Sequence, residues 1–172
     1  MSTIKNLSLP LRGNELEVRV GSHRGNWCSL MIYKDARVDM ARLDEVVGAE
    51  NWSRKHYAEK NNLFCSVGIK GEDGQWVYKD DVGEPSNVHS QKGEASDSFK
   101  RACTNWGIGR ELYDAPYKNL NVQLEQKDMN SQGKPNLFGW YVKNKSEDGK
   151  VVAVGIYDRD NTLRVKKEVT TK

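Results

Sequence analysis

The sequence predicts an α+β fold in which an antiparallel β-sheet packs against one long helix. Three observations lead to this prediction: strand-like alternation recurs along the chain, tight turns separate the strand candidates, and one regular apolar stripe marks a long helix. Strands that are joined by tight turns pair antiparallel. The expected architecture is therefore a β-β-β-α core, followed by a C-terminal β-hairpin region.

Alternation of apolar and polar residues marks the strands of the first half. Leu16, Val18 and Val20 are separated by charged residues, which is typical of a half-buried strand. The same pattern predicts a strand over 63–69, and a Glu-Asp-Gly turn leads from it to a strand over 75–79. A further strand is expected over 27–33.

Helical spacing of apolar residues appears twice. Residues between Val38 and Val47 predict a short helix, with Asp39 as its N-cap and Gly48 as its end. The longer helix, about 94–106, carries a single apolar stripe. The stripe consists of Ala95, Phe99, Ala102, Cys103 and Trp106. Residues 80–92, rich in Gly, Pro, Ser and acidic side chains, are expected to form a loop before this helix.

The last third of the chain is expected to be β-rich, with strands over 138–143, 150–157 and 162–165. At 172 residues, the chain fits a single domain, 1–172. Five tryptophans raise the question of base stacking. Packing is expected instead for four of them: Trp52, Trp76, Trp106 and Trp140.

Composition narrows the class of protein. The net charge is +3; residues 118–172 hold 11 Lys and Arg against 7 acids, and the rest hold 16 against 17. A nucleic-acid site would therefore need local clustering of cations. No apolar run is long enough to span a membrane, the first residues lack the apolar region of a signal peptide, and three scattered cysteines suit a reducing compartment. We expect a cytoplasmic protein without a membrane partner.

Motifs for nucleotide binding or nucleophilic catalysis are missing, so no cofactor is expected. Two alternatives remain open. Asp80, Asp81 and Glu84 are suitable ligands for Mg²⁺, which would make the protein a metal-dependent nuclease. A helix-on-sheet domain with C-terminal lysines could instead bind structured RNA. Lys100 and Arg101 lie off the apolar stripe of the long helix, either as phosphate ligands or as an ordinary solvated face.

Several short motifs occur in a familiar order. They are Tyr33-Lys34-Asp35-Ala36-Arg37-Val38, Leu43-Asp44-Glu45-Val46-Val47-Gly48, Asn51-Trp52-Ser53, Asp80-Asp81-Val82-Gly83, Asp97-Ser98-Phe99-Lys100-Arg101-Ala102 and Trp106-Gly107. This arrangement resembles the Rad52/22 family of single-strand annealing and double-strand-break repair proteins, and it is similar above all to the short bacteriophage members. The resemblance covers about 24–112 and implies a family-like core over about 16–117, with an extension over about 118–172.

The resemblance implies a non-enzymatic protein that anneals complementary single strands without ATP or a metal. It implies a ring or helical filament of identical subunits that holds single-stranded DNA in a basic groove, with a single-strand-binding protein as a further partner. The groove residues that match are Arg24, Tyr33, Arg37, Lys100 and Arg101. A second DNA site would include Lys60 and Lys92. The family's next helix cation is replaced by Thr104, so one groove contact is either missing or supplied by another residue such as Arg110.

Overall fold

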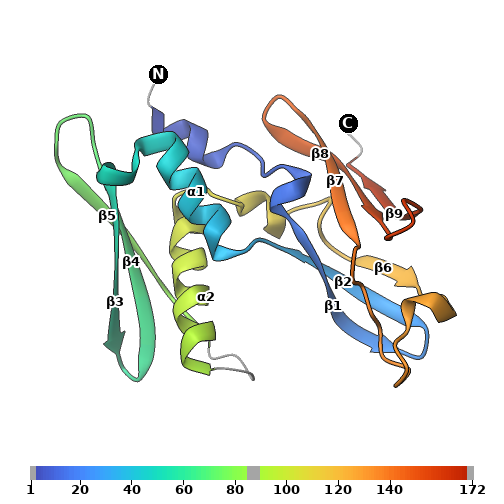
Figure 1. Ribbon diagram of the computed structural model, residues 1–172. Helices are drawn as coiled ribbons and strands as arrows, with labels where there is room; N and C mark the ends of the chain where they lie inside the picture. Colours follow the sequence, from blue (N-terminus) through green and yellow to red (C-terminus); the bar gives the residue numbers. More distant parts are fainter. Residues whose placement is uncertain (1–2, 85–89, 170–172) are drawn as a thin grey trace. The chain divides into compact units, whose positions relative to one another are not determined.

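A computed structural model describes residues 3–84 and 90–169. The chain folds into two compact units that are interleaved along the sequence (Figure 1). Unit 1 consists of the segment up to Leu9 and Ala36–Arg110, and unit 2 consists of Pro10–Asp35 and the chain from Glu111 onward. The expectation of a single domain over 1–172 stays a prediction. Within the described ranges, no helix is both long and apolar enough to cross a membrane.

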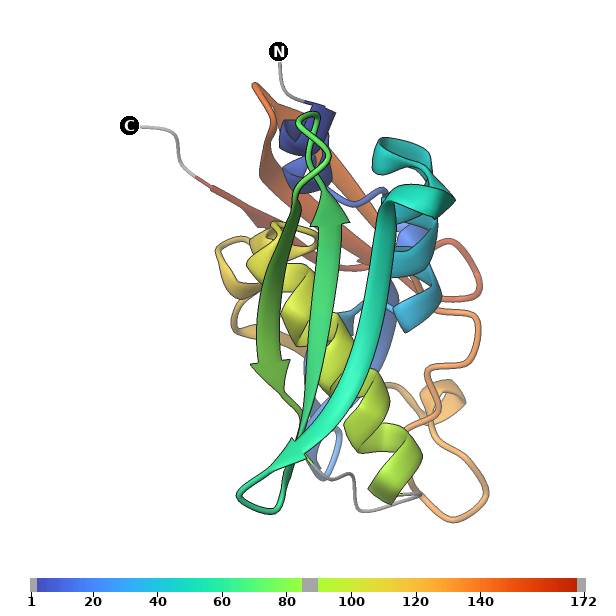
Figure 2. The same cartoon turned by 90° about the vertical axis from the view of Figure 1, so that its left-hand side faces the viewer.

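Unit 1 is a three-stranded antiparallel sheet with two helices. Its elements are α1 (Ala36–Val47), β3 (Trp52–Glu59), β4 (Asn62–Lys70), β5 (Trp76–Val82) and α2 (Ser90–Asn105), and the strand order is β3-β4-β5. Figure 2 shows α2 running along one face of this sheet. Its closest packing is against β4 and β5.

The apolar stripe of α2 explains why the helix packs on β4. Phe99 and Cys103 are fully buried, as are the inward residues Val67 and Cys65 of β4. The indole Nε1 of Trp106 donates a hydrogen bond to the Val67 carbonyl at 3.0 Å. The helix ends before Gly107, which has a φ of 106° that favours glycine. The stripe and its end are as predicted.

The short helix α1 begins earlier than predicted. It starts at Ala36, so Asp39 lies inside the first turn and is fully buried, and its expected role as N-cap is wrong. The predicted end is correct: Gly48 follows the helix with a φ of 89°, and its N–H donates to the Asp44 carbonyl at 3.1 Å.

Unit 2 contains two further antiparallel sheets. The first has the order β1-β2-β6 and is formed by β1 (Glu17–Arg24), β2 (Trp27–Tyr33) and β6 (Leu120–Gln123). The second has the order β7-β8-β9 and is formed by β7 (Tyr141–Glu147), β8 (Lys150–Tyr157) and β9 (Leu163–Glu168). A bulge interrupts β1 between Val20 and Ser22.

The mixed α and β composition and the antiparallel pairing are confirmed. The finer expectation of one sheet on one long helix differs from the structure, which divides nine strands of the described chain among three sheets. Strands β3 and β6 were not predicted. The loop predicted over 80–92 is partly wrong: β5 continues to Val82 and α2 begins at Ser90, and residues 85–89 lie outside the described residues.

Candidate nucleic-acid interface

One face of the β1-β2-β6 sheet gathers cations, aromatic rings and small polar groups. The strand register pairs Arg24 with Trp27 and Trp27 with Gln123, so these side chains share a face. The alternate residues of β2, Cys28 and Leu30, are buried on the opposite side. We call this surface the outer face; it consists of Glu17, Arg19, Ser22, Arg24, Trp27, Ser29, Met31, Tyr33, Asn121 and Gln123.

Arg24 and Tyr33, both predicted site residues, lie on the outer face. Arg24 is exposed at the end of β1, and Tyr33 is half-buried at the end of β2. The Tyr33 hydroxyl donates a hydrogen bond to Glu17. The guanidinium carbon of Arg19 lies 3.8 Å from the centroid of the Tyr33 ring. The predicted pair therefore occupies one surface, and Arg19 joins it as a cation that sequence reasoning missed.

The environment of Tyr33 keeps its hydroxyl protonated. Burial first, and then the hydrogen bond to the Glu17 carboxylate, raises the pKa of Tyr33 to about 12, although nearby Arg19 opposes the shift. At neutral pH, Tyr33 thus presents an uncharged ring whose hydroxyl donates to Glu17, so the phenol adds no negative charge to the surface.

The predicted helix cations lie in unit 1. Lys100 and Arg101 are half-buried on α2, off its apolar stripe. The Arg101 Nε lies 2.9 Å from Asp97 Oδ2, and its Nη2 lies 3.0 Å from Glu84 Oε1. Two carboxylates therefore balance the Arg101 charge in this structure. A phosphate that binds Arg101 must compete with them.

The remaining predicted cations of unit 1 are distributed over several elements. Arg37 is exposed in the first turn of α1, and Lys60 is exposed in the turn between β3 and β4. Lys92 belongs to α2, but its side chain lies outside the described residues. Arg110 binds the end of α2: its Nη2 donates to the carbonyls of Thr104 and Asn105, each at 3.0 Å.

The three acids of the nuclease alternative have separate partners. The Tyr57 hydroxyl donates to Asp80 Oδ2 at 2.8 Å, the Asn105 amide donates to Asp81 Oδ2 at 3.1 Å, and Glu84 pairs with Arg101. Asp80 and Asp81 are consecutive in β5, so their side chains point to opposite faces of the sheet. In the part of the chain that the structure describes, no group of three metal-ligating side chains is close enough to hold an ion.

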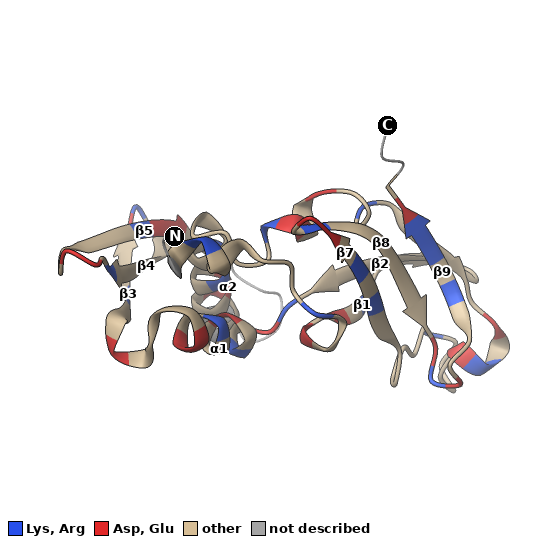
Figure 3. Ribbon diagram, turned by 90° about the horizontal axis from the view of Figure 1, so that it is seen from above, with Lys and Arg blue, Asp and Glu red and all other residues tan. Residues whose placement is uncertain are grey.

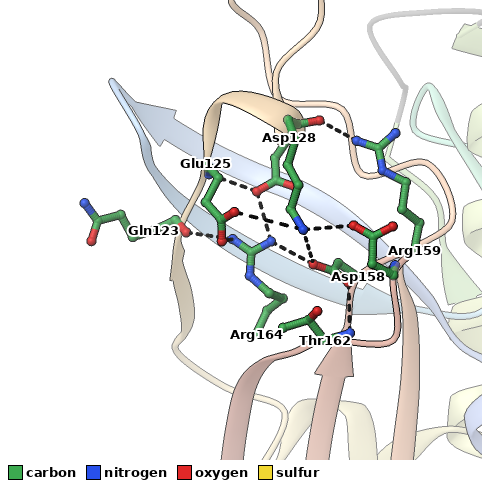
Figure 4. A network of polar contacts seen from close by, with 9 residues as sticks. Gln123, Glu125, Asp128, Asp158, Arg159, Thr162 and Arg164 are labelled. Carbon is green, nitrogen blue, oxygen red and sulfur yellow. Dashed lines mark hydrogen bonds and ion pairs between the residues drawn. The ribbon is translucent and has the colours of Figure 1, made fainter.

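Lys and Arg recur along β9 (Figure 3). Arg164 among them is a structural residue with a side chain only 6% exposed. Its guanidinium contacts Asp128 at 3.0 Å and Asp158 at 3.1 Å (Figure 4). Its Nη2 also donates to the Gln123 carbonyl at 3.1 Å. The C-terminal third thus anchors β6, one of the three strands that carry the outer face.

The acid at the centre of this network stays ionised. Burial alone would raise the pKa of Asp158, but the Thr162 N–H, Lys127 and Arg164 stabilise the carboxylate and hold its pKa well below the usual range. The carboxylate accepts hydrogen bonds from two loop amides as well as from the two cations. This fixes the turn between β8 and β9.

The packing predicted for four tryptophans is complete for three of them. Trp106 and Trp140 are buried, and Trp52 stacks on Phe99 with a centroid separation of 6.2 Å. Trp76 packs only in part: it is 38% exposed, and its ring stacks on Tyr78. Its strand, β5, is an edge strand, and the Trp76 ring lies on the face opposite α2 beside Tyr78.

Comparison with known proteins identifies the family of this chain. A family model described as Rad52/22 family double-strand break repair protein matches residues 2–131. The chain belongs to this family. The single-stranded DNA-binding protein DdrA of Deinococcus radiodurans is 33% identical over 93 residues, which cover 51% of this chain and 42% of that relative. The aligned region thus spans less than half of the length of DdrA and about half of this Rad52/22 family member.

Proposed function

We propose that this Rad52/22 family member binds single-stranded DNA and anneals complementary strands during homologous recombination and repair. The observation that carries the proposal is the outer face, where Arg19 lies over the Tyr33 ring and Arg24 lies opposite Trp27 at the other end of the same strand pair. A surface of this kind contacts phosphates through its cations and bases through its rings. Membership in a repair family and the similarity to DdrA, a single-stranded DNA-binding protein, support the same function.

Each unit contributes phosphate ligands in this proposal. Unit 2 provides Arg24, and unit 1 provides Lys100, Arg101 and Arg37. These cations neutralise the repulsion between two approaching strands, so annealing needs no ATP, metal or covalent step. A ring or helical filament of identical subunits would repeat the few cations of each chain into a continuous track.

The reducing cytoplasm is the compartment we propose, because Cys28, Cys65 and Cys103 are all free thiols. A single-strand-binding protein that coats the DNA before annealing is a further proposed partner. The second DNA site at Lys60 and Lys92 also remains a proposal.

A strand-annealing time course tests this function. Two complementary labelled oligonucleotides are mixed with the protein without nucleotide, once with Mg²⁺ and once with EDTA, and light scattering gives the mass of the assembly. We expect accelerated annealing by a large oligomer, in both buffers, with strand lengths unchanged. Shortened strands in Mg²⁺ would favour the nuclease, and a preference for duplex RNA in competition would favour the RNA-binding alternative. Annealing no faster than the spontaneous reaction would refute the proposal.

A further inference from the structure

The outer face carries a large indole ring that the fold does not use. Trp27 and Met31 are each 58% exposed, although both belong to a strand whose alternate residues are buried. Trp27 lies at the tip of the β1–β2 hairpin, directly opposite Arg24 on one side and Gln123 on the other. An exposed indole between a cation and an amide is a typical ligand-binding arrangement.

The hairpin tip holds Trp27 in a defined place. Gly25 and Asn26 form the turn, and Gly25 has a φ of 58°. The Asn26 carbonyl accepts a hydrogen bond from the Leu124 N–H at 2.7 Å, which continues the β2–β6 pairing beyond its last strand residue. A ring on such a fixed backbone loses little conformational entropy when it stacks on a ligand.

The exposed rings of unit 1 are in a different situation. Trp76 stacks on Tyr78 at 6.2 Å, and Tyr57 stacks on Phe64 at 5.4 Å. These rings cover one another on the face of the β3-β4-β5 sheet that is opposite α2. In the described part of the chain, Trp27 has no such ring partner and no cation over its ring. Its face is open to a planar group.

The charge around Trp27 favours an anionic partner, and the open ring favours one that carries planar bases. Arg19 and Arg24 share the outer face with a single acid, Glu17, which is hydrogen-bonded to Tyr33. The positions between them hold small polar groups, Ser29 and Asn121 among them. A positively charged surface with one open aromatic ring and several neutral hydrogen-bonding groups is complementary to an unpaired base beside its phosphate.

We propose that Trp27 stacks on an unpaired base of single-stranded DNA while Arg24 contacts the adjacent phosphate. This inference rests on the proposed function and deepens it, because it adds a base-dependent part to a binding reaction that is otherwise carried by phosphates. Stacking tolerates any base, so the contact secures the strand without selecting a sequence.

The test compares a short oligothymidylate with an abasic strand of equal length and charge. Both carry the same phosphates, but only the first offers bases to Trp27. We expect the full-length protein with Trp27→Ala to bind oligothymidylate about tenfold more weakly than the unchanged protein, and to bind the abasic strand equally well. Trp27→Phe, which keeps a ring, should retain most of the affinity. Trp76→Ala is the matched control, since it removes an exposed indole from the other unit.

The outcomes separate this inference from the function on which it rests. Equal loss on both strands, or no loss on either, overturns the assignment of Trp27 while leaving DNA binding intact. Failure of the unchanged protein to bind oligothymidylate refutes the proposed function itself. A fall in assembly mass on Trp27→Ala, with DNA affinity per subunit unchanged, would show that a second copy of the chain occupies the ring, and would also overturn the stacking proposal.

Discussion

Arg164 joins the buried acids of unit 2, and replacing it with Met tests how much this network contributes to stability. The guanidinium lies 3.0 Å from Asp128 and 3.1 Å from Asp158, and both carboxylates are 1% exposed. R164M removes the cation but keeps an unbranched chain that fills part of the space. Two buried carboxyl groups then face each other with one cation fewer between them.

The expected cost follows from this geometry. Breaking a buried ion pair by removing one partner costs about 3–5 kcal/mol. Lys127 still contacts Asp158 at 3.2 Å and offsets part of the loss. We therefore expect R164M to lower the free energy of unfolding by an amount near the lower end of this range, about 3 kcal/mol. For a chain of this size, that corresponds to a fall in melting temperature of about 6–12 °C.

Thermal and urea denaturation followed by circular dichroism at neutral pH measures this change. The matched control is K166M on the same strand. Lys166 pairs with Glu168 at 2.7 Å, but the two side chains are 61% and 60% exposed, so its removal should leave the melting temperature nearly unchanged. If R164M melts at the same temperature as K166M, the network is not a stabilising one and the reasoning is refuted.

Three further predictions concern DNA binding and pH. Lys100→Ala with Arg101→Ala should weaken binding to every single-stranded sequence alike and lower the salt slope of the affinity by about 1.4, because each phosphate contact contributes about 0.7. Asp97→Asn should strengthen binding by about two- to fivefold, because it releases the Arg101 Nε from its partner at 2.9 Å. The lowered pKa of Asp158 stabilises the fold above the unfolded-state value of about 3.9 and ceases to do so as the pH falls through the folded-state pKa. Acid should therefore reduce the gap in melting temperature between the unchanged protein and Asp158→Asn.

Each of these predictions has a control and an opposing result. Lys70→Ala is the control for the double variant of Lys100 and Arg101, since Lys70 is an exposed cation of unit 1 on β4. An unchanged salt slope in the double variant would exclude these α2 cations as phosphate ligands. Glu72→Gln is the control for Asp97→Asn. Equal gains in DNA affinity for both variants would indicate a general effect of lost negative charge. A gap between the unchanged protein and Asp158→Asn that stays constant with pH would show that this carboxylate does not couple to folding.

The elements that could be predicted are those in which one face is apolar. The α2 stripe and the alternation over 63–69 each describe a buried face directly, and both elements lie close to where they were expected. β3 escaped prediction because its inward positions after Trp52 include two polar residues, Arg54 and His56. Arg54 lies over the Phe99 ring at 4.8 Å, and the His56 Nε2 is 3.0 Å from the Ala95 carbonyl oxygen, so neither interrupts the packing on α2.

The candidate site could be predicted in part. The family motifs led to Arg24 and Tyr33, and the structure places both on the outer face. Arg19 was missed, although the alternation that buries Leu16 also points this residue outward. Trp27 could not be assigned from sequence, because the exposure of an indole at a strand end depends on which face of the sheet is covered. That information comes only from the folded sheet, in which β2 pairs with β6, a strand far away along the chain, and buries Cys28 and Leu30 on one face.

The pairing of β2 with β6 also affects how the protein is made. A growing chain releases β1 and β2 early, whereas Leu120–Gln123 follows only after the whole of Ala36–Arg110 has been synthesised. Until then, one edge of β2 has no partner, and an unpaired edge can join a strand of another chain. The intervening segment belongs to unit 1, and its folding replaces a long flexible loop with an ordered body before β6 arrives. Translation speed between these two points is thus expected to influence the yield of correctly folded protein.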